Sequence, residues 1–211
     1  MFAYHNDPRT KEDIISQLEF HKLADQLEQG AYWDNHFKKG CAVGCTIYSN
    51  NHIEYEHRFG IPANLAMIEE GIFEGLSVEA SKNWPIDFMK AINVGSNLEG
   101  VDWIICRYAF SLRKDNYPKL IYDIIDDMLA SLSEGVEDKK IEKYARPMLY
   151  EVIEQSHRIN YRKPSYVKLI TLDCYLHAII HRWCDSIFYK YTTDEVKKVA
   201  DFTINLLKDI K

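Results

Sequence analysis

Two cysteines and two histidines stand close together in the sequence, and all four side chains are of types that bind zinc. They are Cys41, Cys45, His52 and His57. A structural zinc ion takes about four nitrogen or sulfur ligands in a tetrahedron. The spacing is Cys-x3-Cys, then six residues, then His-x4-His, so the central gap is shorter than that of a zinc finger. The same residues also fit a cysteine-dependent hydrolase, in which one thiol is the nucleophile and one imidazole the base.

The small residues around the cysteines favour a third interpretation, which is close packing. Gly40 and Gly44 precede the cysteines, and together with Ala42 they leave little side-chain bulk. Such a surface suits close contact between backbones, and a buried cysteine behaves as a small hydrophobic residue. We therefore predict that GCAVGC is a packing element that shapes a pocket. We expect no metal and no cofactor there.

The segments that follow supply the expected walls of this pocket. Residues 60–76 offer an apolar face toward the glycines, formed by Leu65, Ile68, Ile72 and Phe73. His52, Tyr55 and Glu56 are expected near one rim, where a ligand or partner would be recognised.

A polar stripe occurs late in the chain, where four residues recur at intervals of four: Asp173, His177, His181 and Asp185. This spacing places them along one side of a helix. Carboxylate–imidazole pairs at the edge of a core are the favoured interpretation, and a metal site is the alternative.

A basic patch is the last candidate site, and it consists of Arg146, Arg158, Tyr161, Arg162 and Lys163. Arginine and tyrosine side by side contact phosphates and stack on bases in nucleic-acid-binding proteins. Cations also gather at the C-terminal ends of helices because the helix dipole favours them there. The second interpretation is favoured, with nucleic acid as the alternative.

The elements that must position these residues are predicted to be helical almost throughout. Thr10 is expected to cap a helix that stops at Gly30, and Gly60 to end a short helix through HIEYEHRF. Pro62 suits the first turn of the next helix. Thr192 and Glu195 form a capping box for a last helix over 193–209. CAVGCTIYS fits either a strand or a tightly packed helix. The predicted fold is an all-α, irregular bundle of about eight or nine helices.

Composition and charge place the protein among ordinary globular proteins. The cysteines number five, which is odd, and they are widely spread, so reduced thiols are expected. No apolar run is long enough to span a bilayer, and no signal peptide is recognised. A cytoplasmic location is therefore expected. Residues 1–113 carry 10 basic and 16 acidic residues, whereas residues 114–211 carry 16 of each. This difference suggests an N-terminal module over 1–113 and a C-terminal subdomain over 114–211, or else one continuous domain.

Three motifs together carry a resemblance to a family of proteins. KGCAVGCTI, GIPANLAMIEEGIFEGL and WPIDFMKAI resemble a family of uncharacterised proteins from bacteria and their phages, over roughly residues 38–100. The activity of that family is unknown, so the resemblance assigns no catalytic residue.

Three functions follow as hypotheses. The first is a non-enzymatic interaction or regulatory protein of phage or mobile-element type that binds a protein partner, because no strong catalytic motif occurs. The second is a cysteine- or metal-dependent hydrolase centred on Cys41, Cys45, His52 and His57. The third is a nucleic-acid-binding accessory protein, which the net charge of −6 does not favour.

Overall fold

The structure is a computed structural model, and it describes residues 1–116, 119, 122–123, 126–127, 129–130, 134 and 191–211. The chain divides into two compact units, one of residues 1–99 with 187–211 and one of residues 100–186. The boundary suggested by the charge pattern, between residues 113 and 114, falls inside the second unit.

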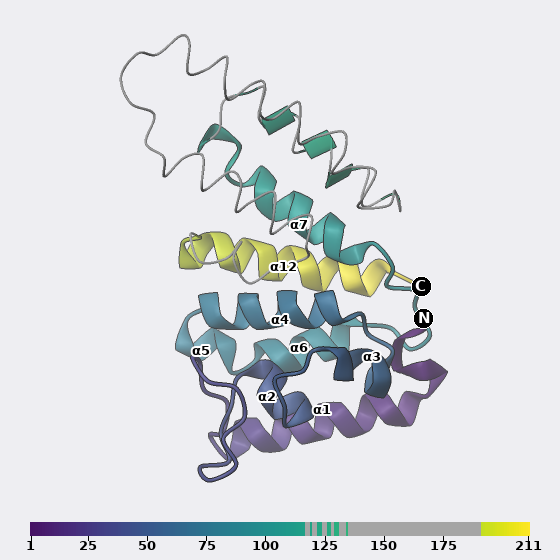
Figure 1. The fold of residues 1–211 in the computed structure, drawn as a ribbon, viewed down its shortest axis with the longest axis vertical. Coiled ribbons are helices and arrows are strands. Elements are labelled where there is room, and N and C mark those ends of the chain that lie inside the picture. Colours follow the sequence, from purple (N-terminus) through teal and green to yellow (C-terminus); the bar gives the residue numbers. More distant parts are fainter. Residues whose placement is uncertain (117–118, 120–121, 124–125, 128, 131–133, 135–190) are drawn as a thin grey trace. The chain divides into compact units, whose positions relative to one another are not determined.

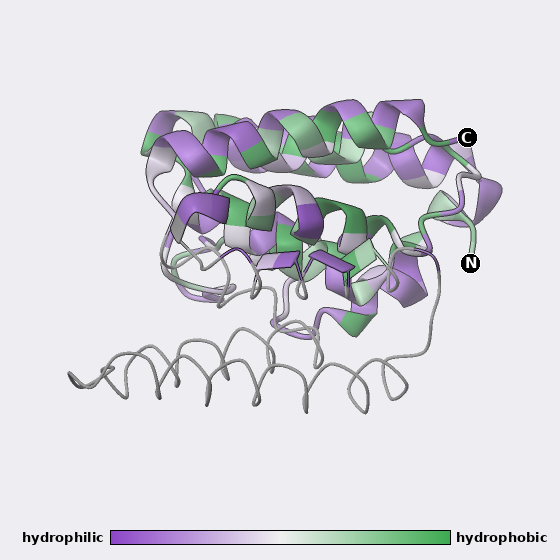
Figure 2. Cartoon of the chain, turned by 90° about the horizontal axis from the view of Figure 1, so that it is seen from above, coloured by the Kyte–Doolittle hydropathy of each residue, from purple (hydrophilic) through white to green (hydrophobic). Residues whose placement is uncertain are grey.

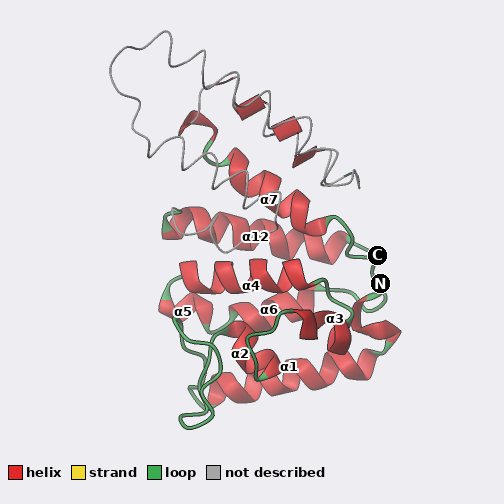
Figure 3. Cartoon of the chain, viewed as in Figure 1, coloured by secondary structure: helices red, strands yellow, loops and turns green. Residues whose placement is uncertain are grey.

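The part of the chain that the structure describes is all-α, as predicted, with eight α-helices, two short 3-10 helices and no strand (Figures 1 and 3). The elements of the first unit are η1 (Ala3–Asn6), α1 (Pro8–Leu23), α2 (Ala42–Ile47), α3 (Ile53–Phe59), α4 (Ala63–Gly75), α5 (Val78–Ser81), α6 (Trp84–Ala91) and α12 (Thr193–Asp209). The second unit contributes α7 (Val101–Ser111) and η2 (Lys114–Asn116). None of the helices in these ranges has the length and apolar character needed to cross a membrane.

Helix α1 differs from its prediction at both ends. Asp7, rather than Thr10, is the N-terminal cap, and its carboxylate accepts the backbone N–H of Arg9 at 2.9 Å. Pro8 takes the first helical position, where its missing N–H does no harm. The helix ends at Leu23 instead of continuing to Gly30, because Asp25 turns the chain with a left-handed φ of 54°.

Two other predicted helix ends are confirmed, whereas Pro62 is the N-terminal cap of α4 rather than a residue of its first turn. Gly60 closes α3 with a φ of 62°, a conformation that costs glycine little. Thr192 and Glu195 form the capping box of α12, each side chain bonding to the backbone N–H of the other residue.

Helix α4 lies at the centre of the first unit and packs against α2, α3, α6 and α12. Its buried residues span every face, as expected of a helix enclosed by others. Helix α12 lies alongside α4 in the first unit (Figure 1). Along its ribbon hydrophilic and hydrophobic residues alternate, which is typical of a helix with one buried side (Figure 2).

The N-terminal residues form a left-handed turn that no sequence pattern predicted. Tyr4, His5 and Asn6 have φ values of 54°, 52° and 62°, a region that costs most residues roughly 1–2 kcal/mol each. The turn inserts Tyr4 into the core, where its hydroxyl donates to the carbonyl of Met89 at 2.6 Å. Burial of this ring and its hydrogen bond offset the strain.

Candidate functional site

The GCAVGC segment forms a short buried helix, α2, which rules out the strand alternative. Cys41 is its N-terminal cap, and its sulfur accepts the backbone N–H of Gly44 at 3.4 Å. At the other end, the side-chain amide of Gln17 on α1 donates to the carbonyls of Cys45 and Thr46 at 2.7 and 3.0 Å. The helix is therefore fixed at both ends by side chains.

The glycines of this segment allow the backbone of a loop to lie very close to α2. A Cβ atom on Gly40 would lie 2.8 Å from the carbonyl oxygen of Tyr32, and one on Gly44 would lie 2.8 Å from the amide nitrogen of Trp33. Small residues are thus needed, but the backbone that approaches them is residues 32–33 rather than α4. Helix α4 packs against α2 elsewhere, and the four apolar residues expected to face the glycines are fully buried: Leu65, Ile68, Ile72 and Phe73.

Both cysteines of the motif are buried and neutral. The thiol of Cys41 donates to Glu70 Oε1 at 3.4 Å, and Cys45 Sγ lies 3.4 Å from the carbonyl of Gly40. Burial raises the pKa of Cys45 to about 12. Burial also raises the pKa of Cys41, and the negative charge of Glu70 raises it further. At neutral pH both thiols are therefore protonated, and neither supplies the thiolate that a nucleophile requires.

The two histidines lie in different surroundings. His52 Nε2 is 2.6 Å from Glu70 Oε2, whereas His57 is exposed, with Nδ1 4.0 Å from Glu54 Oε1. In the described part of the chain, no three histidine, cysteine or acidic side chains are arranged to hold a metal ion. Cys41, Cys45, His52 and His57 therefore do not form the joint site that their spacing suggested.

Glu70 is the residue that brings the candidate residues together. Its carboxylate accepts hydrogen bonds from Cys41, from His52 and from the hydroxyl of Tyr32, the last at 3.5 Å. We call Tyr32, Cys41, His52 and Glu70 the Glu70 cluster. Because these residues come from a loop, α2, α3 and α4, the cluster ties all four elements together. No spacing in the sequence pointed to Glu70, since its partners lie far away along the chain.

The neighbouring carboxyl group, that of Glu69, has quite different surroundings. It is completely buried, its Oε2 accepts the hydroxyl of Tyr55 at 2.6 Å, and its Oε1 has no hydrogen-bond partner. Burial raises the pKa of Glu69 to about 8, with a smaller contribution from the charge of Glu70. Tyr55 is therefore a core residue and does not lie at a rim as expected.

Glu56 accepts the first backbone N–H of α4, that of Ala63, at 3.0 Å.

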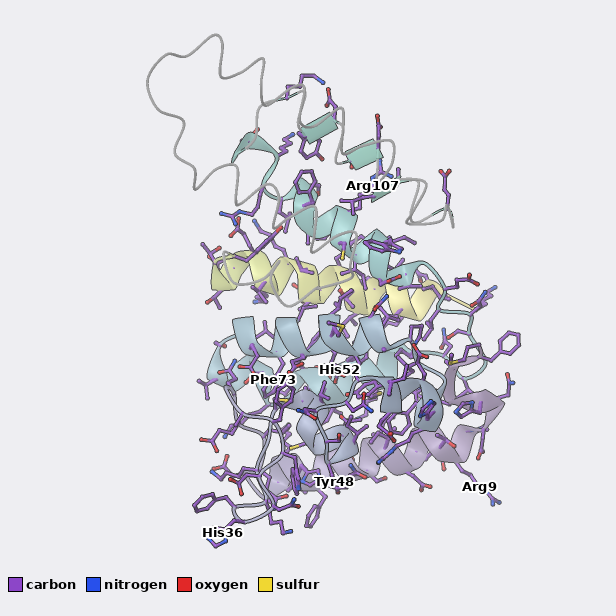
Figure 4. All side chains as sticks on the ribbon, viewed as in Figure 1. Arg9, His36, Tyr48, His52, Phe73 and Arg107 are labelled. Atoms are coloured by element: carbon purple, nitrogen blue, oxygen red, sulfur yellow. The ribbon has the colours of Figure 1, made fainter. Side chains whose placement is uncertain are left out.

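A cluster of aromatic rings lies next to α2. The His21 ring contacts Phe20, Trp33 and Tyr48 edge to face. Trp33 and Tyr48 also contact each other, with their centroids 4.7 Å apart. Phe20 is 63% exposed and Tyr48 is 46% exposed, whereas His21 is buried. We call these four residues the aromatic surface; Tyr48 is labelled in Figure 4. Sequence reasoning missed it because its members come from α1, a loop and the end of α2.

Two predicted sites lie outside the described residues. One is the stripe of Asp173, His177, His181 and Asp185. The other is the basic patch of Arg146, Arg158, Tyr161, Arg162 and Lys163. Both stay predictions.

No protein-family model, curated protein or solved structure matches the chain. The resemblance to an uncharacterised bacterial and phage family therefore stays a prediction, and the site is interpreted from its own geometry.

Proposed function

We propose that the protein is a non-enzymatic interaction protein that binds a protein partner through the aromatic surface. The observation that carries this proposal is the cluster of rings around the buried His21, in which Phe20 and Tyr48 are open to solvent. Phe20 is 63% exposed, and Leu23, one helical turn further along α1, is 87% exposed. Large apolar side chains gathered in this way are typical of interaction sites.

The chemistry of the aromatic surface suits a protein partner. Tryptophan and tyrosine are enriched among the residues that contribute most to binding at protein interfaces. Such rings offer a large apolar area with a polar group at the edge. Tyr48 is 46% exposed although its hydroxyl bonds to the buried His21, and the neighbouring Trp33 ring is half-buried.

The surface is also held in place before any partner arrives. His21 bonds through one ring nitrogen to Gln26 Oε1 at 2.6 Å and through the other to the Tyr48 hydroxyl at 3.0 Å. Gly44 allows the backbone at Trp33 to lie against α2. Rings that are already ordered lose little conformational entropy on binding, which favours affinity. In this proposal the GCAVGC helix is the support of a binding surface.

The hydrolase hypothesis has one supporting feature, the contact of Cys41 and His52 with the same carboxylate. Two features weigh against it. The thiol is buried and neutral, and His52 points its Nε2 at Glu70 instead of at the sulfur. The nucleic-acid hypothesis depends on residues 146–163, outside the described part of the chain.

The test is affinity purification of partners from cells that naturally express the protein. The variant Phe20→Ser/Leu23→Ser removes two exposed apolar side chains from the aromatic surface and its edge. The matched control is Val78→Ser, which removes a 68% exposed apolar side chain on α5. We expect the double variant to lose an identified partner that the wild-type protein and Val78→Ser retain, with all three melting at similar temperatures. Equal recovery of every partner by the double variant would contradict the proposal.

A further inference from the structure

The Glu69 carboxyl group lies in the core with fewer hydrogen-bond donors around it than a buried negative charge needs. Glu69 and Tyr55 are both completely buried, and among the described residues the tyrosine hydroxyl is the only side-chain donor to the carboxyl group. Within the same residues its Oε1 has no hydrogen-bond partner. An ionised carboxylate in such a place carries a large desolvation penalty, which is avoided while the group holds its proton.

The groups around Glu69 do not offset a negative charge. Tyr55 faces it from α3, Tyr4 from η1, and Glu70 lies next to it on α4. From α2, Cys41 acts on Tyr55. The buried residues of α6 and α12 carry no titratable group: Trp84, Pro85, Ile86, Phe88, Met89, Ala91, Val196, Val199, Ala200, Thr203 and Leu207. None of the groups that shift the pKa of Glu69 is a cation.

Helix α3 is a short cover over this carboxyl group. It has seven residues, and only Tyr55 and Phe59 are buried. Ile53 and His57 are exposed, and Glu56 and His52 contribute single hydrogen bonds to α4. A short helix with few buried contacts opens locally at a lower free-energy cost than a core helix. Displacement of α3 therefore gives water a path to Glu69.

We propose that Glu69 is a proton-dependent latch that holds α3 against α4. While the carboxyl is protonated, the Tyr55 bond and the packing of Phe59 keep α3 closed. When the proton leaves, α3 moves away from α4 and water solvates the carboxylate. The Tyr55 hydroxyl bonds more strongly to the ionised form, but this gain is smaller than the desolvation penalty, as the direction of the Glu69 pKa shift shows. Because His52 sits at the start of α3, opening also releases the Glu70 cluster.

Hydrogen exchange of the full-length protein, followed by mass spectrometry, tests the latch. Rates are corrected for the intrinsic effect of pH on amide exchange. We expect the opening constant of α3 amides to rise by roughly tenfold per pH unit and to level off near pH 8. In Glu69→Gln the constant should not change with pH. The control Glu79→Gln, which alters an exposed carboxylate on α5, should behave as the wild-type protein does.

A second variant keeps the test decisive if Glu69→Gln does not fold. Tyr55→Phe removes the donor that favours the ionised carboxylate, so the levelling-off should move to a higher pH. An unchanged pH profile in both variants would overturn the proposal. So would opening of α1 and α4 in step with α3, because that result describes unfolding of the whole unit. Neither result bears on the aromatic surface.

Discussion

At the scale of single residues, Glu69 and Glu70 show how neighbouring carboxyl groups acquire different properties. A rotation of about 100° per residue along α4 turns one into the core and the other toward the Glu70 cluster. Glu70 accepts three hydrogen bonds, whereas Glu69 accepts one and leaves an oxygen unpaired. Glu70 therefore connects elements, and Glu69 makes stability depend on pH.

The first prediction concerns that pH dependence. The pKa of Glu69 is raised in the folded protein from 4.5 to about 8, so the folded state binds the proton more tightly than the unfolded state. The contribution of Glu69 to stability is fully present below pH 4.5 and is lost as pH rises toward about 8. The loss amounts to roughly 1.4 kcal/mol per pH unit within that window. Urea unfolding of the wild-type protein and Glu69→Gln at several pH values should show a difference that grows with pH. A constant difference would contradict the assignment.

The second prediction concerns Cys45. Its thiol is buried and neutral, and it belongs to no group that could hold a metal among the residues that the structure places. Cys45→Ala should cost about 1–2 kcal/mol for lost packing and leave the protein folded. Removal of a structural zinc ligand would instead unfold the protein. Thermal melting with and without a chelator checks this, and joint unfolding by the variant and by the chelator would restore the zinc hypothesis.

At the scale of elements, close backbone contacts decide which glycines are essential. Gly44 lets the loop at Trp33 lie on α2, and Gly60 does the same for the N-terminal turn against α3. Both contacts join segments that are remote in sequence. The stability of the aromatic surface and of the turn therefore depends on the absence of a single methyl group.

The third prediction is a large effect of Gly44→Leu. Its Cβ would lie 2.8 Å from the Trp33 amide nitrogen, and backbone atoms cannot yield as a flexible side chain does. Overpacking of this kind costs roughly 1–3 kcal/mol or more. We also expect the loop at Trp33 to move, which tryptophan fluorescence would report. Normal stability with unchanged fluorescence would show that the contact is not tight.

The fourth prediction compares Gly60→Ala with Gly30→Ala. Both glycines have positive φ, so an alanine at either position should destabilise the folded state by roughly 1 kcal/mol through backbone strain. At Gly60 the new methyl would also collide with the carbonyl oxygen of Phe2, whereas at Gly30 nothing lies within 4 Å. Gly60→Ala should therefore lower the free energy of unfolding clearly more than Gly30→Ala in denaturant titrations. Equal losses would mean that the N-terminal turn does not pack on α3 as described.

A structural feature could be predicted from the sequence when the residues that form it lie close together along the chain. The Thr192–Glu195 capping box and the Gly60 stop were predicted correctly because caps are local interactions. The Asp7 cap was missed because Thr10 offers the same chemistry three residues later. Glu70 and the aromatic surface were missed because their partners meet only after the chain has folded. The buried position of Tyr55 likewise depends on α4, which no local pattern around Tyr55 reveals.

At the scale of the whole molecule, the two ends of the chain meet in one unit. Helix α12 packs on α4 and α6, and the side-chain amide of Asn93 donates to the carbonyls of Lys208 and Ile210 at 3.0 and 2.7 Å. A division of the chain by charge follows sequence order, so it could not anticipate a unit that combines residues 1–99 with 187–211.

The last prediction tests this discontinuous unit through α12. Val199 is completely buried, and Val199→Asp would place an unpaired charge in the core, a change that costs several kcal/mol. The matched control is Lys198→Asp, at the neighbouring exposed position of the same helix. If α12 belongs to the unit of α1–α6, Val199→Asp should raise amide exchange in α4 and α6 together with α12, and Lys198→Asp should not. If residues 1–113 instead formed a module of their own, α4 and α6 would keep their protection in both variants. Because the two divisions predict opposite behaviour of helices more than a hundred residues from the substitution, one exchange experiment distinguishes them.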